Sequence, residues 1–274
     1  MKKRLDQLLL ERELADSITK AQSLILSGNV LVNEQREDKS GKQFEENVSI
    51  RIKNVEGPYV GRGGLKLEHA LDFFKINPAG KVCMDVGAST GGFTDCLLQR
   101  QAKKVYAVDV GYGQLDWKIR NDPRVVVLER ENIRRLSRET IPDPIDLAVI
   151  DVSFISLKLV FPIVQKFLTP SPHPPPIQGG GGGMVIALVK PQFEVKKERV
   201  GKKGVVTDEK LQEETVTTIQ KAGESLGWKW NGSTPSPILG AEGNREFLIT
   251  FSTTRCLALT GHGENESDWT KIDQ

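Results

Sequence analysis

The chain has 274 residues, of which 38% are hydrophobic and 27% are charged, and its formal net charge is +2. This composition is that of an ordinary globular protein with enough apolar residues for a core, and it excludes disorder along the whole chain. The small positive charge permits a nucleic-acid partner without requiring one. No apolar stretch reaches the roughly 18 residues that span a bilayer, so we expect neither membrane insertion nor secretion.

The three cysteines are Cys83, Cys96 and Cys256. They are odd in number and widely spaced, and no Cys-x-x-Cys pair or histidine at ligand spacing accompanies them. Such a pattern indicates reduced thiols without a structural zinc. We therefore expect a cytoplasmic protein that holds no metal.

Residues 1–56 predict a small α+β domain. Leucines at 5, 8 and 9 have helical spacing, and a second helix is expected over residues 16–27, with Gly28 as its C-cap. Two short β-prone runs follow, residues 30–32 and 48–52, and a polar stretch that contains Gly41 separates them.

Glycines and a proline in residues 57–64 indicate an interdomain linker, and helical periodicity returns from Leu65 to Phe74. Residues 65–253 then alternate apolar strand-like runs with helical stretches; the runs are 81–86, 104–110, 124–128, 147–152 and 184–189. This alternation predicts an α/β fold with a doubly wound, mostly parallel Rossmann-like sheet and helices on both faces. Residues 169–183 are expected to form a flexible insertion, and residues 254–274 a disordered tail.

The first strand of this sheet turns into a helix through a loop that contains Gly87, Gly91 and Gly92. These glycines would let a ligand approach the backbone closely. The next strand ends in Asp109, at the same sheet edge as Asp85, where a carboxylate can accept both hydroxyls of a ribose. Ser89 replaces the middle glycine of a dinucleotide-binding motif, so an adenosine cofactor without a pyrophosphate, such as S-adenosylmethionine, fits better. The expected cofactor contacts are Asp85, Gly87, Ala88, Ser89, Thr90, Gly91, Gly92, Phe93, Asp109, Asn132 and Asp151.

Two later strands are followed by Asp151 and Lys190. The carboxyl ends of parallel strands face one crevice, so these side chains should converge on the ligand. Methyl transfer to a ribose hydroxyl needs a base that removes the hydroxyl proton. We predict that Lys190 is this base and that Lys66, on the helix before the first strand, assists at the ribose. For each residue singly, a solvated lysine or a helix-capping aspartate is an alternative that stays open.

Several motifs resemble the TlyA family, historically called haemolysin A, which is similar to the FtsJ-type ribose 2'-O-methyltransferases. The motifs are GRGGLKLEHAL (61–71), DVGASTGGFTDCLL (85–98), VDVGYGQL (108–115), DVSFISL (151–157), LVKPQFE (188–194), RVGKKGVV (199–206) and GNREFL (243–248). The match is long and specific. Residues 1 to about 56 resemble the RNA-binding domain of the ribosomal protein S-four type.

The resemblance implies an S-adenosylmethionine-dependent enzyme that methylates a ribose 2'-hydroxyl of rRNA within ribosomal subunits, with a cytidine-type target. It implies a Lys-Asp-Lys-Glu catalytic tetrad, which falls on Lys66, Asp151, Lys190 and Glu246, whereas Glu242 lies outside the Gly-Asn-x-Glu match. No motif demands a metal or an obligate protein partner.

The expected RNA contacts lie in two regions. Residues 1–56 hold ten basic and ten acidic side chains, so only a one-sided arrangement would bind phosphates, and we place it around Lys2, Lys3, Arg4 and Lys20. The loop after Lys190 would overhang the crevice. Its basic residues are Lys196, Lys197, Arg199, Lys202 and Lys203, and Arg62 completes the expected set.

Two other functions stay open at this point. A non-catalytic rRNA-binding assembly factor could keep the cofactor fold as a scaffold, although the intact glycine loop and tetrad positions argue against it. The family's old name suggests a membrane-lytic protein, which no amphipathic or spanning segment supports.

Overall fold

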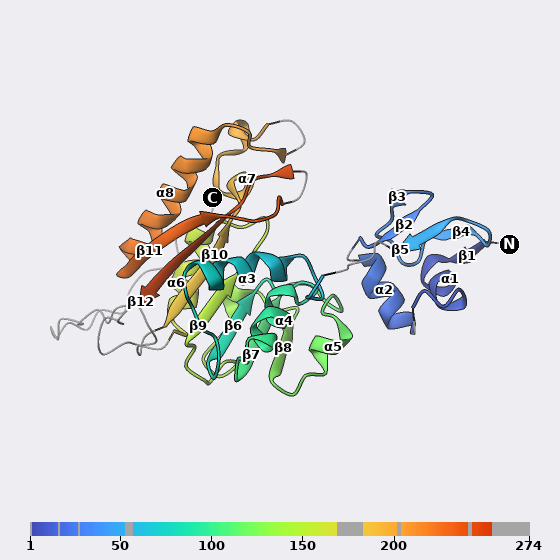
Figure 1. Cartoon of the computed structure of the whole chain (residues 1–274), viewed down its shortest axis with the longest axis horizontal. Helices are drawn as coiled ribbons and strands as arrows, with labels where there is room; N and C mark the ends of the chain where they lie inside the picture. Colours follow the sequence, from blue (N-terminus) through green and yellow to red (C-terminus); the bar gives the residue numbers. More distant parts are fainter. Residues whose placement is uncertain are drawn as a thin grey trace.

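The computed structural model describes residues 2–15, 17–26, 28–52, 57–168, 183–201, 204–240 and 243–253. The described residues form a small N-terminal unit and a larger α/β unit (Figure 1). No helix in these ranges is long and apolar enough to cross a membrane. The predicted insertion, apart from Gly183, and the predicted tail lie outside the described residues.

The N-terminal unit packs two helices on short strands. Its core contains Leu5, Leu9, Ile25 and Val30. β2 pairs with β3 and β5, and β1 pairs with β4, all antiparallel. The elements are β1 (Lys2–Arg4), α1 (Leu5–Glu11), α2 (Ile18–Leu26), β2 (Val30–Val32), β3 (Gln35–Arg36), β4 (Gln43–Glu45) and β5 (Ile50–Ile52).

Both predicted N-terminal helices are present. The prediction missed β1, β3 and β4, and it treated the stretch around Gly41 as irregular. These strands have two or three residues, and their pattern is largely exposed and polar, so no apolar alternation reveals them. Their main-chain pairing closes the small fold around α1 and α2.

The larger unit alternates strands and helices as the sequence predicts. It comprises α3 (Gly63–Phe73), β6 (Val82–Val86), α4 (Gly92–Gln99), β7 (Lys104–Asp109), α5 (Trp117–Arg120), β8 (Val125–Glu129), η1 (Ile133–Arg135), β9 (Leu147–Ile150), α6 (Leu157–Gln165), β10 (Met184–Val189), α7 (Pro191–Glu194), η2 (Lys197–Arg199), α8 (Glu209–Ser225), β11 (Trp228–Pro235) and β12 (Phe247–Thr253).

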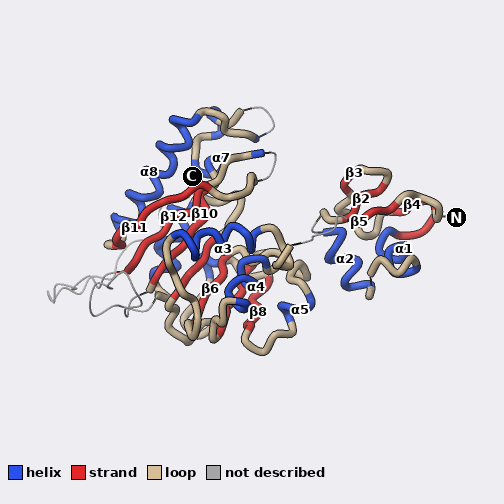
Figure 2. The backbone as a smooth tube through the Cα atoms, in the orientation of Figure 1, coloured by secondary structure: helices blue, strands red, loops and turns tan. Residues whose placement is uncertain are grey.

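One seven-stranded sheet forms the centre of this unit, with the order β11-β12-β10-β9-β6-β7-β8. Figure 2 shows these strands between helices. The pairs β9–β10, β6–β9, β6–β7 and β7–β8 are parallel, whereas β12 is antiparallel to both β10 and β11. The predicted α/β class with a mostly parallel sheet is confirmed.

Alternate residues of each strand pack into two separate cores. On one face, side chains such as Met84 and Ile150 pack with α6 and α8. On the other face, Cys83 and Val149 pack with α3 and α4. Because both faces are covered, the central strands are apolar at nearly every position, which is why they were visible in the sequence.

The segment predicted as a linker, residues 57–64, contacts the larger unit. Tyr59 is buried in its core, and the Val60 N–H donates to Asp95 Oδ2 (2.9 Å). Gly63 and Gly64 belong to the first turn of α3, two residues before the predicted helix start. The domain bounds stay a prediction.

The edge strand β11 is irregular. Its register against β12 shifts between Trp230 and Gly232, and Gly232 has a φ of 137°. The strand carries the exposed Lys229 and ends at Pro235.

We predict that Phe161→Ala destabilises the larger unit by about 3–5 kcal/mol, because it empties a fully buried site. The Phe161 ring lies 5.0 Å from the Trp228 ring and 5.7 Å from the Phe251 ring, between centroids. Urea unfolding followed by tryptophan fluorescence measures the loss. Leu159→Ala, at an exposed position of the same helix, should change stability by less than about 0.5 kcal/mol. Equal losses for both variants would contradict this assignment of the core.

Candidate active site

Strand register brings three of the four predicted catalytic residues to one edge of the sheet. Asp151 directly follows β9, and Lys190 directly follows β10, which runs parallel to it. Glu246 directly precedes β12, whose Phe247 pairs with Val189 at the end of β10. Since β12 is antiparallel, it enters the sheet at the edge where β9 and β10 leave it.

The four residues form two ion pairs. Lys190 Nζ lies 2.6 Å from Asp151 Oδ1 and donates to Ser153 Oγ at 2.9 Å. Lys66, on α3, donates from Nζ to Glu246 Oε2 at 2.5 Å, and both side chains are buried. A Cβ on Gly63, one turn before Lys66, would lie 3.9 Å from Asp151 Oδ2, so the start of α3 adjoins the first pair.

A cleft of about 740 Å³ opens beside the Lys190–Asp151 pair. This volume suits a nucleoside-sized ligand. The cleft follows the carboxyl ends of β6, β7 and β9, where a doubly wound sheet binds its ligands. Of the predicted cofactor contacts, its lining includes Gly87, Ser89, Asp109, Asn132 and Asp151.

Backbone N–H groups hold the Asp109 carboxylate at the cleft wall. Ser89 N–H donates to Oδ2 and Gly111 N–H donates to Oδ1, both at 2.7 Å. Each carboxylate oxygen has a second lone pair, so Asp109 can still accept ribose hydroxyls. Asn132 accepts from the Arg134 N–H at 3.0 Å and is exposed at the cleft.

Of the other predicted cofactor contacts in the glycine loop, Ala88, Gly91, Gly92 and Phe93 are buried and Thr90 is half-buried. Phe93 is buried in the core, and a Cβ on Gly92 would lie 2.9 Å from Gly64 N. Gly91 has a φ of 95° and packs on Leu115 and Ile119. Close packing against neighbouring residues therefore explains why glycine stands at positions 91 and 92. Ala88, Thr90, Gly91, Gly92 and Phe93 do not line the cleft, and their contact with a cofactor stays a prediction.

Gly87 shapes the cleft most directly. Its φ is 90°, and a Cβ there would overlap the carbonyl oxygen of Asp151. Glycine tolerates this backbone conformation, whereas other residues rarely adopt it. The glycine loop and the residue after β9 are therefore in direct main-chain contact.

Asp85 lies fully buried beneath the cleft. Thr94 Oγ1 donates to its Oδ2 at 2.6 Å, and its Oδ1 has no hydrogen-bond partner within the described residues. Burial raises the pKa of Asp85 to about 7, and the negative charges of Asp151 and Asp109 act in the same direction. The residue supports the base of the cleft and does not line it.

The fixed carboxylate of Asp109, the glycine turn at Gly87 and the cleft volume together fit a nucleoside cofactor without a pyrophosphate. No cluster of three or more His, Cys, Asp or Glu side chains that could hold a metal occurs among the described residues. Cys83 and Cys96 are free and buried, and Cys256 lies outside the described ranges.

Two family models match this architecture. The FtsJ-like methyltransferase model matches residues 59–253, and the S4 domain model matches residues 3–50. The 16S/23S rRNA (cytidine-2'-O)-methyltransferase TlyA of Mycobacterium tuberculosis is 41% identical over 261 residues, which cover 95% of this chain and 93% of that protein. The chain belongs to the TlyA family of FtsJ-like methyltransferases.

Other members support this assignment. The 23S rRNA (cytidine-2'-O)-methyltransferase TlyA of Campylobacter jejuni is 34% identical over 194 residues, 70% of each chain. A solved structure described as a hemolysin from Streptococcus thermophilus is 39% identical, with a TM-score of 0.68, and the match covers 92% of this chain and 89% of that one. The predicted TlyA resemblance is confirmed, and so is S-adenosylmethionine as the cofactor of this methyltransferase.

The TlyA-family cleft also contains residues that the sequence reasoning did not assign. They include Val110, Gln114, Glu131, Arg134, Ser153 and Phe154. Val110, Gln114, Ser153 and Phe154 lie within the quoted motifs, and Glu131 lies two residues after the end of β8, so position after a strand end was the available signal.

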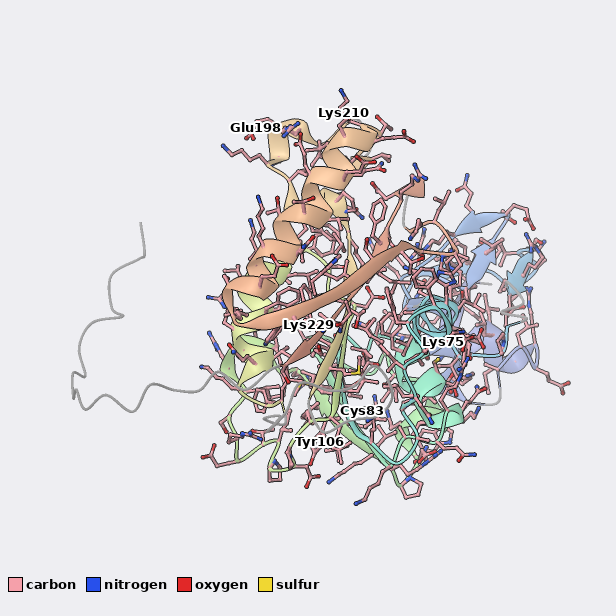
Figure 3. All side chains as sticks on the ribbon, turned by 60° about the vertical axis from the view of Figure 1, so that its left-hand side comes forward. Lys75, Cys83, Tyr106, Glu198, Lys210 and Lys229 are labelled. Carbon is pink, nitrogen blue, oxygen red and sulfur yellow. The ribbon has the colours of Figure 1, made fainter. Side chains whose placement is uncertain are left out.

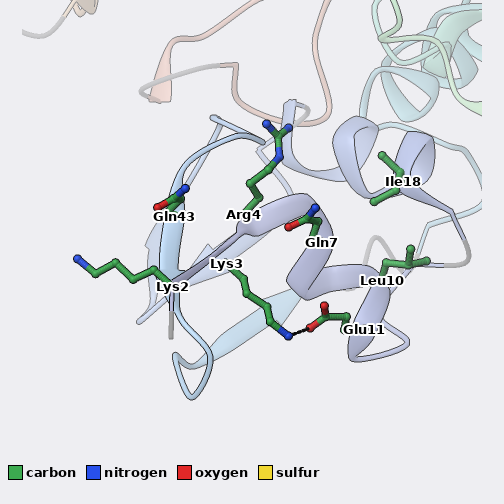
Figure 4. Close-up of a pocket in the computed structure, with 8 residues that line it drawn as sticks. All are labelled: Lys2, Lys3, Arg4, Gln7, Leu10, Glu11, Ile18 and Gln43. Carbon is green, nitrogen blue, oxygen red and sulfur yellow. Dashed lines mark hydrogen bonds and ion pairs between the residues drawn. The ribbon is translucent and has the colours of Figure 1, made fainter.

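Acidic neighbours pair most of the basic residues predicted to bind RNA in the N-terminal domain. Lys3 pairs with Glu11 at 2.8 Å, and Arg4 pairs with Asp6 at 2.6 Å. Figure 4 shows the Lys3–Glu11 pair and the extended Lys2 side chain. Lys20 reaches Asp116 of the larger unit at 2.6 Å. Within the described residues, Lys2 is the member of this set without an acidic partner.

On the larger unit, Arg62, Lys196 and Lys197 are exposed, and Arg199 lies 3.4 Å from Glu214. Lys202, Lys203 and Glu242 lie outside the described residues. The exposed lysines come after α7 in the stretch that follows Lys190, and RNA contact by all of these residues stays a prediction.

We expect Asp85→Asn to remove a pH dependence of stability. Because the folded pKa is about 7 and the ordinary value is 3.8, the wild type keeps its full contribution below about pH 4 and loses it as the pH rises to about 7. The full loss should be on the order of 4 kcal/mol. Denaturant unfolding at pH 4.5, 6 and 7.5 measures it. A constant difference between wild type and variant across this range would contradict the prediction.

Proposed function

We propose that this protein transfers the methyl group of S-adenosylmethionine to the 2'-hydroxyl of a cytidine in rRNA. The buried Lys66–Glu246 pair and the half-buried Lys190–Asp151 pair, whose Asp151 lines a nucleoside-sized cleft, are the observation that carries the proposal. The rRNA cytidine-2'-O-methyltransferase names of two relatives support the acceptor. When bound, S-adenosylmethionine supplies an electrophilic methyl group.

The proposed roles follow from the placement of each side chain. Asp151, 2.6 Å away, orients the Lys190 ammonium and takes one proton from it, and the neutral amine then removes the proton of the 2'-hydroxyl. Ser153 fixes the direction of the same amine through its hydroxyl. Lys66 holds the ribose, and Glu246 holds Lys66 in the buried position.

The substrate is proposed to be rRNA within ribosomal subunits in the cytoplasm, without an obligate protein partner. The S4 domain match and the exposed Lys196 and Lys197 support contact with RNA outside the catalytic cleft. The names of the relatives differ in whether they include 16S rRNA, so both subunits are candidate substrates.

Lys190→Ala should lower methyl transfer by about 10²- to 10⁴-fold, because it removes the proposed base. Transfer of tritiated methyl from S-adenosylmethionine to isolated small and large subunits measures the rate, and equilibrium binding measures donor affinity, which should stay within about threefold. Lys166→Ala, at an exposed position at the end of α6, is the matched control and should match the wild type. Donor binding by the wild type without label on either subunit would instead support a non-catalytic assembly factor.

The double variant Lys196→Ala/Lys197→Ala should weaken subunit binding. It should also lower the slope of the logarithm of the binding constant against the logarithm of the salt concentration by about two, since two phosphate contacts are lost. The control Lys75→Ala/Lys229→Ala removes the same charge from the exposed sites labelled in Figure 3. Binding measured between about 50 and 200 mM salt gives the two slopes. Equal slopes for both double variants would contradict a specific RNA contact by this loop.

A further inference from the structure

The five-residue segment from Lys190 to Glu194 contacts the loop that follows β9 at several points. Its first residue, Lys190, contacts Asp151 and Ser153. The Phe193 ring lies 4.9 Å from the Phe154 ring, between centroids. At its end, Glu194 contacts the first turn of α6, so the two segments meet at successive points along their length.

Glu194 caps α6 from outside that helix. The Leu157 N–H donates to Oε1 at 2.7 Å, and Ser156 Oγ donates to Oε2 at 2.5 Å. The first N–H groups of a helix lack partners within the helix, and a carboxylate near them is favourable. Ser156 also accepts from the Lys158 N–H at 3.2 Å, so one hydroxyl joins the cap of α6 to Glu194.

These contacts join the segments 151–156 and 190–194 at both ends, so that the two segments form a closed ring of backbone and side-chain contacts that includes the Asp151–Lys190 pair. Glu194 is one helical turn from Lys190 along α7, and Pro191 begins that turn with its fixed φ. Ser156 is joined to Asp151 by four residues without helix or strand structure, of which Phe154 has a positive φ of 64°. The Asp151–Lys190 pair joins the two segments at one end and the Ser156–Glu194 contact joins them at the other, with the Phe154–Phe193 contact between them.

We propose that Glu194 is a positioning residue for methyl transfer, which ties the loop bearing Asp151 and Ser153 to the segment bearing Lys190. This inference rests on the proposed function. Glu194 does not contact the reacting groups itself. Its loss frees the Leu157 N–H and the Ser156 hydroxyl, lets the loop move relative to α7, and displaces the partners of the Lys190 amine.

Kinetics of Glu194→Ala test the inference. We expect kcat, expressed per donor-binding site, to fall about 10- to 100-fold, since a displacement near 1 Å can cost about 10²-fold. KM for the subunit should stay within about threefold, and donor binding is measured in the same variant so that kcat refers to occupied sites, because the displaced loop lines the cleft. Glu194→Gln, which keeps an acceptor for Leu157 and can donate to Ser156, should recover most of the rate. A merely structural role would reduce the number of donor-binding sites and leave kcat per site unchanged.

The matched control is Glu198→Ala. Glu198 is an exposed glutamate in η2, four residues after Glu194 and labelled near Lys210 in Figure 3, and its removal changes the charge equally. Amide hydrogen exchange of residues 151–160 gives a readout independent of activity, and it should rise in Glu194→Ala and stay unchanged in Glu198→Ala. Wild-type kcat and exchange in Glu194→Ala would overturn the role of Glu194 alone. A wild type that labels no subunit would contradict the proposed function itself.

Discussion

The antiparallel insertion of β12 between β10 and β11 is the constraint on which the reactive site depends. The parallel strands β9 and β10 deliver Asp151 and Lys190 at their carboxyl ends. A seventh parallel strand would begin at the opposite edge, about 20 Å away over its seven residues. By running in reverse, β12 brings Glu246 to the edge where Lys190 lies, and α3 covers that position with Lys66.

Removal of these charges from water, nearly complete for Lys66 and Glu246 and partial for Lys190 and Asp151, explains why each lysine is paired with a carboxylate. An ion removed from water is costly unless an opposite charge and hydrogen bonds accompany it. Lys66 with Glu246 and Lys190 with Asp151 satisfy this requirement pair by pair, and the formal charges of the four groups sum to zero. This sheet edge can therefore hold two cationic amines, one of them paired with a carboxylate that lines the cleft, without a large mutual repulsion.

Features that depend on neighbouring residues could be predicted from the sequence, whereas contacts between residues far apart in the chain could not. The apolar run 147–150 is buried at every position, so the strand and the location of Asp151 after it could be predicted locally. Lys66 and Glu246 are separated by 180 positions, and only the family resemblance brought them together. No role was predicted for Ser153 or Glu194, because their partners depend on how the loop after β9 packs against α7. β1 and β4 were missed because their pairing uses main-chain groups of polar residues.

The irregular edge strand β11 has a consequence for the behaviour of the protein in concentrated solution. A straight, apolar edge strand offers unpaired main-chain groups to a second molecule, which can extend the sheet and begin aggregation. The register shift before Gly232 bends β11, Lys229 adds an exposed charge, and Pro235 lacks an N–H donor. This combination disfavours edge-to-edge pairing, so the open sheet can end at β11 without recruiting a neighbouring chain.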